Sequence, residues 1–302
     1  MAINRLRCGY LYLAVAMVLV GSTVTASKII GVGLPPFTAT ALRFAIALPC
    51  FALLMAATGA RLPRLHRRDW LLLTVQAVAG SVGYTTLLIA GLQRTSAVDG
   101  GIILGTLPLV TAAIAMLLGE RPGRRALAAI GMAAFGVWLM TSRTPSRGMD
   151  GSLAGNALIL GAVACEGLFI LLNKRLRTPV APLALSTLMT AFGLAFSAVA
   201  SLTEAPWALD YTPGAVAAVA YYALVPTVGG FLLWYAGAAR VPGSEAALFT
   251  ALAPVSAVML SASLLDEPVT GAQIAGISCV LGGVLAMTRR GGPRSNGTGD
   301  GI

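Results

Sequence analysis

The stretch LPLVTAAIAMLLGERP, from Leu107 to Pro122, is repeated in outline by APVSAVMLSASLLDEP, from Ala253 to Pro268. Each copy places a proline early in an apolar run and ends with an acidic residue and a second proline. The early prolines, Pro108 and Pro254, lie 146 positions apart. The chain therefore carries one helical pattern twice, and the interval can be tested along the rest of the sequence.

The same interval of 146 residues aligns glycines, prolines and charges along nearly the whole chain. These residue types mark backbone breaks and helix ends, so a shared apolar composition does not explain the matches. Matched pairs include Lys28/Lys174, Pro36/Pro182, Gly83/Gly229, Asp99/Glu245 and Gly136/Gly282. The sequence predicts a first repeat at residues 1–146, a second at 147–290 and a disordered cytoplasmic tail at 291–302.

The composition is that of an integral membrane protein. Of the 302 residues, 57% are hydrophobic and 11% are charged, and the mean hydropathy is +0.83, whereas a soluble domain has about a quarter charged residues. The runs are apolar on all sides, unlike barrel strands, so they are predicted to be all-α spans that satisfy their own backbone groups. Ten runs qualify: 9–28, 37–58, 70–92, 96–118, 125–142, 153–173, 182–202, 214–238, 244–265 and 269–287.

The basic residues predict the orientation of these ten helices. Of the 21 Lys and Arg, 16 fall on the side of the N-terminus, here called side A, four fall on the opposite side B, and Arg43 lies within a span. Basic loops are cytoplasmic, so both termini are expected in the cytoplasm. The net charge of +10 then reports orientation, and no nucleic-acid partner is expected.

The four cysteines have no paired spacing, so we expect neither a disulfide framework nor a metal site. No cofactor is expected either. The expected partners are a small-molecule substrate and membrane lipids, and the chain is expected to be a monomer.

A repeat of five helices reverses the chain's direction across the membrane. Because five is odd, the second copy enters from the opposite face, and the 5+5 arrangement is predicted to be an inverted repeat. Two such halves can open a site at the membrane midplane alternately to either face. This is the geometry of a transporter.

The details of helices four and five resemble a known family. Helix four runs through a proline to GERP and is followed by AIGMAAFGVWLM, and the second copy has DEP and IAGISCVLGGVLAM. This pattern resembles the EamA-type members of the drug/metabolite transporter superfamily and, within it, the YddG-type amino-acid exporters of bacterial inner membranes. The resemblance implies a basket of ten helices around a central cavity, with helices five and ten at its periphery, and amino-acid export.

Two charges lie well inside predicted spans, where each costs about 2.5–3.5 kcal/mol on insertion scales. They are Arg43 and Glu166, and the repeat partners are Met189 and Val20. What a duplication keeps in both copies is scaffold, whereas a charge present in one copy is a candidate for function. Arg43 and Glu166 are therefore the first substrate-binding candidates.

Further polar and aromatic candidates share the depth of these charges. Tyr84, Trp138, Tyr221 and Tyr222 are expected within about one helical turn of Arg43. Together with an acid, these groups could bind the carboxylate and amine of a zwitterion and an apolar side chain. Alternatively, aromatic residues form interfacial belts, to which Trp234 and Tyr235 are assigned. Trp138 could also face lipid from a peripheral helix.

The remaining acids and amides also have two readings. Asp99, nearer side B, either binds substrate or interacts with a helix dipole, as its counterpart Glu245 would. Gln76 lies near the depth of Glu166. Glu166 is a proton-coupling carboxyl, a site for an amine, or a neutral acid bonded within the bundle, because burial disfavours the charged form.

Pro108 and Pro254 are predicted to lie inside helices four and nine, where each removes a helix hydrogen bond. They are either symmetric hinges for opening the two faces or fixed bends that shape the cavity.

The predicted function is secondary transport: export of amino acids, aromatic and other neutral ones, by alternating access. The alternative is export of cationic drugs or other small metabolites, with Glu166 binding the cation. A membrane enzyme or a lipid-handling protein is less favoured, because the Walker, H-E-x-x-H and G-x-S-x-G motifs are absent from the sequence.

Overall fold

A computed structural model describes residues 2–119, 127–128, 131–132, 134–136, 138–139, 149–173, 175–178, 180–241, 249–250 and 252–288. The described residues are helical and contain no strand, as predicted. The first half contains α1 (Ala2–Gly33), α2 (Pro36–Thr58), α3 (Arg67–Gln76), η1 (Ala77–Gly83), α4 (Tyr84–Leu92), α5 (Ala97–Leu104) and α6 (Leu107–Leu117). The second contains α8 (Met149–Asn173), α9 (Pro182–Ser201), η2 (Leu202–Glu204), η3 (Pro206–Ala208), α10 (Pro213–Tyr222), η4 (Ala223–Gly229), α11 (Gly230–Ala238), α13 (Leu252–Leu264) and α14 (Gly271–Thr288).

Six helices among the described residues are long and apolar enough to cross a membrane, and α5 with α6 forms a seventh if this bent pair is one span. Most of the predicted fifth span at 125–142 and the start of the ninth, with Glu245, lie outside the described residues. The predicted tail at 291–302 lies outside them as well. The count of ten helices therefore stays a prediction.

The repeat interval is visible in the backbone. Helix α3, the π-helix η1 and α4 have the same boundaries as α10, the π-helix η4 and α11 after a shift of 146 residues. A π-helix is rare and is found mostly as a single widened turn, frequently at functional sites. Two at equivalent positions are a feature of the repeated unit.

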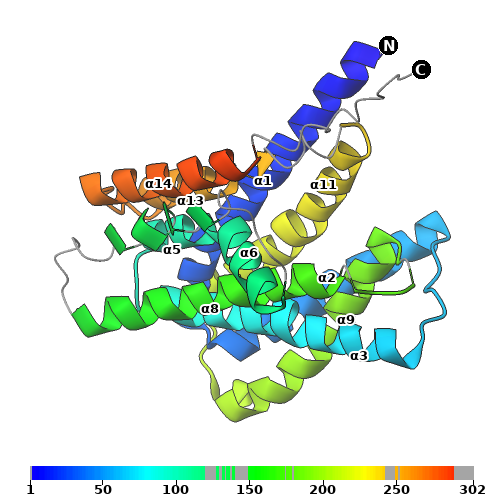
Figure 1. The fold of residues 1–302 in the computed structure, drawn as a ribbon. Helices are drawn as coiled ribbons and strands as arrows, with labels where there is room; N and C mark the ends of the chain where they lie inside the picture. Colours follow the sequence, from blue (N-terminus) through cyan, green and yellow to red (C-terminus); the bar gives the residue numbers. More distant parts are fainter. Residues whose placement is uncertain are drawn as a thin grey trace, which may run out of the picture.

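Contacts at the two ends of α1, which packs beside α11 (Figure 1), identify the two sides of the bundle. On side A, where α1 begins, Gly9 packs against Val241, which follows α11. On side B, where α1 ends, the Lys28 ammonium group donates hydrogen bonds to the carbonyl oxygens of Leu92 and Thr95, each at 2.6 Å. The helices between these contacts connect side A to side B.

The equivalent helices α2 and α9 pack along one another in opposite directions. On side B, Glu204, which follows α9, accepts hydrogen bonds from the backbone amides of Phe37 and Thr38 at 3.0 and 2.7 Å and from the Thr38 hydroxyl at 2.7 Å. The start of α2 therefore lies at the end of α9. Antiparallel packing of equivalent helices is what an inverted repeat requires.

On side A, a second carboxylate joins the start of α3 to the chain just before α9. Asp69, in the first turn of α3, accepts hydrogen bonds from the backbone amides of Arg177 and Thr178 at 3.2 and 3.3 Å. The Thr178 hydroxyl donates a third at 2.7 Å. Each carboxylate thus binds two backbone amides and a threonine hydroxyl, and we call the pair the side A clasp (Asp69) and the side B clasp (Glu204).

The bend expected at Pro108 is present, but its origin differs from the prediction. Helices α5 and α6 meet at 50°, and the chain leaves helical geometry at Gly105 and Thr106. Pro108 lies in the first turn of α6, where a missing N–H breaks no internal hydrogen bond. The prediction that Pro108 removes a hydrogen bond inside a continuous helix is therefore wrong.

Pro254 likewise lies near the start of a helix, α13. A Cβ added at Gly105 would be 2.9 Å from the Pro254 Cβ. The α5–α6 break therefore lies close to the start of α13, and a glycine at position 105 permits that approach.

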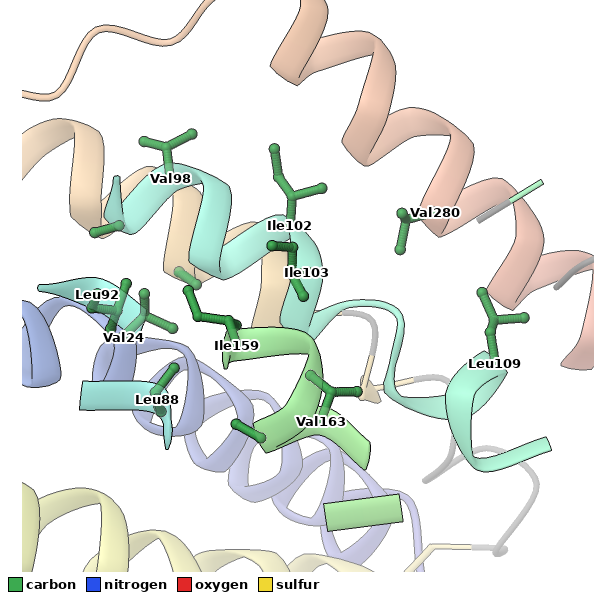
Figure 2. Close-up of a cluster of buried hydrophobic side chains, with 13 residues drawn as sticks. Val24, Leu88, Leu92, Val98, Ile102, Ile103, Leu109, Ile159, Val163 and Val280 are labelled. Atoms are coloured by element: carbon green, nitrogen blue, oxygen red, sulfur yellow. The ribbon is translucent and has the colours of Figure 1, made fainter. Parts of the chain in front are cut away.

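A cluster of buried apolar side chains fills the side B half of the bundle (Figure 2). It joins α1, α4, α5, α6, α8, α13 and α14. The labelled members are Val24, Leu88, Leu92, Val98, Ile102, Ile103, Leu109, Ile159, Val163 and Val280. Because these side chains are 0–1% exposed, the side B half of the bundle is closed at this cluster.

Candidate functional site

A cavity of about 730 Å³ lies between the two repeats. It is lined by side chains from both halves, including both π-helices, both ends of the α5–α6 break and the start of α13. Six of the predicted residues line it: Arg43, Tyr84, Pro108, Glu166, Tyr222 and Pro254. The lining continues to Asn173 at the end of α8 and to Tyr235 near the end of α11, so the cavity extends toward side A.

Arg43, from α2, is held by four neighbours. Its Nε donates a hydrogen bond to the Thr227 hydroxyl at 3.2 Å, and Nη1 donates one to the Thr85 hydroxyl at 2.6 Å. The guanidinium carbon lies 4.2 Å from the ring centroid of Tyr222 and 4.9 Å from that of Phe44. Each cation–π contact contributes about 0.5–2 kcal/mol. The Nη2 group has no hydrogen-bond partner in the described part of the chain, so it is available to an anion in the cavity.

The π-helix η4 explains why Thr227 is placed to hold Arg43. Pro226 lies inside η4 and has no N–H, so the carbonyl oxygen of Tyr222, four residues earlier, loses its usual helical donor. The Thr227 hydroxyl donates a hydrogen bond to that carbonyl at 2.8 Å and accepts the one from Arg43. One threonine therefore completes the widened turn and orients the cation.

Glu166, from α8, lines the same cavity. Its carboxyl group has no hydrogen-bond partner among the described residues, and no ion pair joins it to Arg43 within them. Tyr84 lines the cavity together with these two charges. A cation and an acid thus face one cavity without neutralising each other by direct contact.

Two of the predicted binding residues, Gln76 and Asp99, point away from the cavity into packing contacts. Gln76 is fully buried, and its Nε2 donates a hydrogen bond to the Phe169 carbonyl oxygen at 3.1 Å. Asp99 is 2% exposed and accepts a hydrogen bond from Gln273 Nε2 at 2.7 Å. The structure therefore does not bring Gln76 and Asp99 into the cavity wall.

Tyr221 is 38% exposed and donates a hydrogen bond to the Ser22 hydroxyl of α1 at 2.8 Å. Neighbouring residues in a helix are about 100° apart, so Tyr222 faces the cavity and Tyr221 does not. Trp138 is 61% exposed and packs on Phe135, outside the cavity lining, which favours the peripheral alternative.

Sequence reasoning missed an aromatic wall on α11. Phe231, Trp234 and Tyr235 line the cavity, whereas Trp234 and Tyr235 were assigned to an interfacial belt. The Phe231 ring lies 4.6 Å from the Tyr235 ring and 5.4 Å from the Phe51 ring, centroid to centroid. Trp234 and Tyr235 lie three and four positions after Phe231, and residues at this spacing share one helix face. This spacing, in a span that also contains Pro226, was the available signal.

Thr85 and Thr227 were missed as well, since neither is unusual in an apolar span.

For metal binding, no group of three or more His, Cys, Asp or Glu side chains in the described ranges could hold an ion.

Comparisons with known proteins match most of the chain. The model of the EamA-like transporter family matches twice, at residues 7–142 and 153–289. The uncharacterized transporter YetK of Bacillus subtilis is 36% identical over 91% of this chain and 85% of its own. The inner membrane protein YtfF of Escherichia coli is 32% identical over 43% of this chain and 44% of its own. A solved crystal structure aligns with 93% of this chain and 98% of its own, with a TM-score of 0.64 and 21% identity, a likeness of fold.

Proposed function

Because the chain belongs to the EamA-like transporter family, we propose that this membrane transporter exports amino acids, aromatic and other neutral ones, by alternating access. The substrate's carboxylate binds Arg43, its ammonium group binds Glu166, and its side chain packs against the aromatic wall of α11. Transport is secondary, driven by gradients.

The observation that carries this proposal is the separated pair of charges. Arg43 keeps Nη2 free for a carboxylate while Thr85 and Thr227 hold the rest of the guanidinium. Glu166 has an unbonded carboxyl in the same cavity. A zwitterion satisfies both groups at once, whereas a neutral molecule leaves both without a charged partner.

The size and lining of the cavity support a large side chain on the substrate. Pockets of about 300–1,000 Å³ accommodate drug-sized molecules, and this cavity of about 730 Å³ falls in that range. Phe51, Phe231 and Tyr235 present ring faces and edges that favour aromatic and apolar groups.

The proposed location is the bacterial inner membrane, with side A in the cytoplasm. The excess of basic residues on side A supports this orientation, and the similar Escherichia coli protein is described as an inner membrane protein. The cavity then faces the cytoplasm, the side from which an exporter loads.

A second candidate function is export of organic cations. The unbonded Glu166 carboxyl and the rings of α11 favour it, since aromatic groups bind cations. Against it, Arg43 places a positive charge in the same cavity. Competition by a lipophilic cation that is lost in Glu166→Gln would favour this alternative.

Counterflow in proteoliposomes tests the proposal. Vesicles loaded with unlabelled phenylalanine should accumulate labelled phenylalanine, and Arg43→Ala should reduce this uptake by about 10- to 100-fold at low substrate, since a hydrogen bond to a charged group contributes about 1.5–3 kcal/mol. Arg94→Ala is the matched control, because Arg94 lies outside the cavity and bonds to a carbonyl of its own helix. Counterflow with none of the twenty amino acids would refute the substrate assignment.

A further inference from the structure

The hydroxyl group of Ser27 is buried without a partner. Ser27, on α1, is 0% exposed, and its Oγ has no hydrogen-bond partner in the described part of the chain. Such groups are rare in native structures and call for an explanation. The equivalent residue in the second repeat, 146 positions on, is Asn173, which lines the cavity near side A.

The same contrast, between a residue that lines the cavity and a buried counterpart in the other repeat, holds on the aromatic wall. Trp234 and Tyr235 line the cavity toward side A. Their counterparts in the first repeat are Leu88 and Ile89, which are 0% and 1% exposed. Leu88 is part of the apolar cluster that closes side B (Figure 2).

Two further pairs follow the pattern. Thr111 and Ser186 line the cavity, and their counterparts Ala257 and Thr40 are 1% and 0% exposed. Ala257 belongs to the side B cluster and packs against Gly101, where an added Cβ would be 2.9 Å from the Ala257 Cβ.

At the centre of the cavity, both members of a pair line it. Pro108 and Pro254 do so, and so do Val20 and Glu166. The axis that relates the repeats therefore passes through the cavity. On its side A half, equivalent residues line open space, whereas on its side B half they are packed together.

We propose that Ser27, Thr40, Leu88, Ile89 and Ala257 line the side B half of the translocation pathway, which is collapsed in this conformation. An inverted repeat can exchange the conformations of its two halves. In the exchanged state these residues would take the positions that Asn173, Ser186, Trp234, Tyr235 and Thr111 have here. The Ser27 hydroxyl would then meet water or substrate, which accounts for its unbonded state. This inference rests on the alternating access in the proposed function.

Matched single cysteines test the pathway. In a variant whose four native cysteines are replaced by serine, Ser27→Cys is compared with Asn173→Cys, and Ala257→Cys with Thr111→Cys. A membrane-impermeant thiol reagent is applied to right-side-out and to inside-out vesicles. Leu13→Cys and Ile159→Cys are controls, because these equivalent residues are both 0% exposed and neither lines the cavity.

We expect Asn173→Cys and Thr111→Cys to react from side A, and Ser27→Cys and Ala257→Cys to react from side B. A minor conformation is populated at about 0.1–10%, so the side B reaction should proceed at about that fraction of the rate of an exposed thiol. The two controls should react from neither side. If Ser27→Cys does not fold, Ala257→Cys decides the result.

The pathway is overturned if folded Ser27→Cys and Ala257→Cys are no more reactive from side B than the controls, or if they react only from side A. Labelling needs no substrate, so it is independent of the counterflow assay. Labelling as expected without amino-acid counterflow would refute the proposed substrate and leave the pathway in place.

Discussion

The ring centroid of Tyr222 lies 4.2 Å from the guanidinium carbon of Arg43. The contact joins two repeats, since Arg43 belongs to α2 and Tyr222 to the end of α10. In the first repeat, the position of Tyr222 is occupied by Gln76, which is buried away from the cavity. The aromatic support for the cation is therefore present in one copy only, as Arg43 itself is.

Replacing Tyr222 tests whether its ring holds Arg43 in place. Tyr222→Leu should weaken amino-acid binding by about 2- to 30-fold, because it removes a cation–π contact of about 0.5–2 kcal/mol. Tyr222→Phe keeps the ring and should bind within about twofold of wild type, since the Tyr222 hydroxyl makes no hydrogen bond in the described structure. Isothermal titration of purified protein measures both. Equal losses in the two variants would show that the hydroxyl, and not the ring, is what matters.

Thr227 is a positioning residue, because it acts on substrate through Arg43. Thr227→Val should weaken binding about tenfold, since it leaves Arg43 Nε without its hydroxyl partner at about 1–3 kcal/mol. Thr227→Ser keeps the hydroxyl and should restore most of the affinity. A purely structural role would instead lower the thermal midpoint of Thr227→Val while leaving the affinity of the folded fraction unchanged.

The aromatic wall can be tested by making the repeats alike. Trp234→Leu installs the residue that the first repeat has at position 88. Affinity for phenylalanine should fall about 2- to 13-fold, since an aromatic pair adds about 0.5–1.5 kcal/mol, whereas affinity for alanine should hardly change. Trp207→Leu is the control, because Trp207 is 74% exposed and outside the cavity. An equal loss for both amino acids would exclude a role in selecting the side chain.

The side B clasp should contribute to stability. Glu204→Gln replaces one accepting oxygen by an NH₂ group, which cannot accept a hydrogen bond from a backbone amide. The loss of about 1–3 kcal/mol should lower the thermal midpoint by about 2–4 °C per kcal/mol. Asp210→Asn is the control, because Asp210 is exposed and accepts no hydrogen bond in the described structure. An unchanged midpoint in Glu204→Gln would mean that the clasp adds nothing.

Features that depend on charge and repetition could be predicted from the sequence. The interval of 146 residues reappears in the boundaries of α3, η1 and α4 and of their counterparts. Arg43 and Glu166 line one cavity, and the sequence indicated them because a charge in an apolar span is conspicuous and its repeat partner is apolar. The bend near Pro108 was also expected.

Features that depend on rotation about a helix axis could not be predicted. Counting residues gives the depth of a side chain but not the direction in which it points, so Tyr221 and Tyr222 were both assigned to the site. The π-helices add to this difficulty, because a widened turn shifts the phase of every residue after it. Trp234 and Tyr235 follow η4, and their spacing from Phe231 indicates one shared helix face but not that this face meets the cavity.

The central claim is that Arg43 binds the carboxylate of an amino acid and Glu166 binds its amine. The most direct test is titration of phenylalanine, its carboxamide and its N-acetyl derivative against wild type, Arg43→Ala and Glu166→Gln. Wild type should bind phenylalanine about tenfold or more tightly than either derivative, because each derivative lacks one charged contact. Arg43→Ala should lose the preference over the carboxamide alone, and Glu166→Gln the preference over the N-acetyl derivative alone. If wild type binds all three equally, or if both variants lose both preferences together, the assignment of the two charges is wrong.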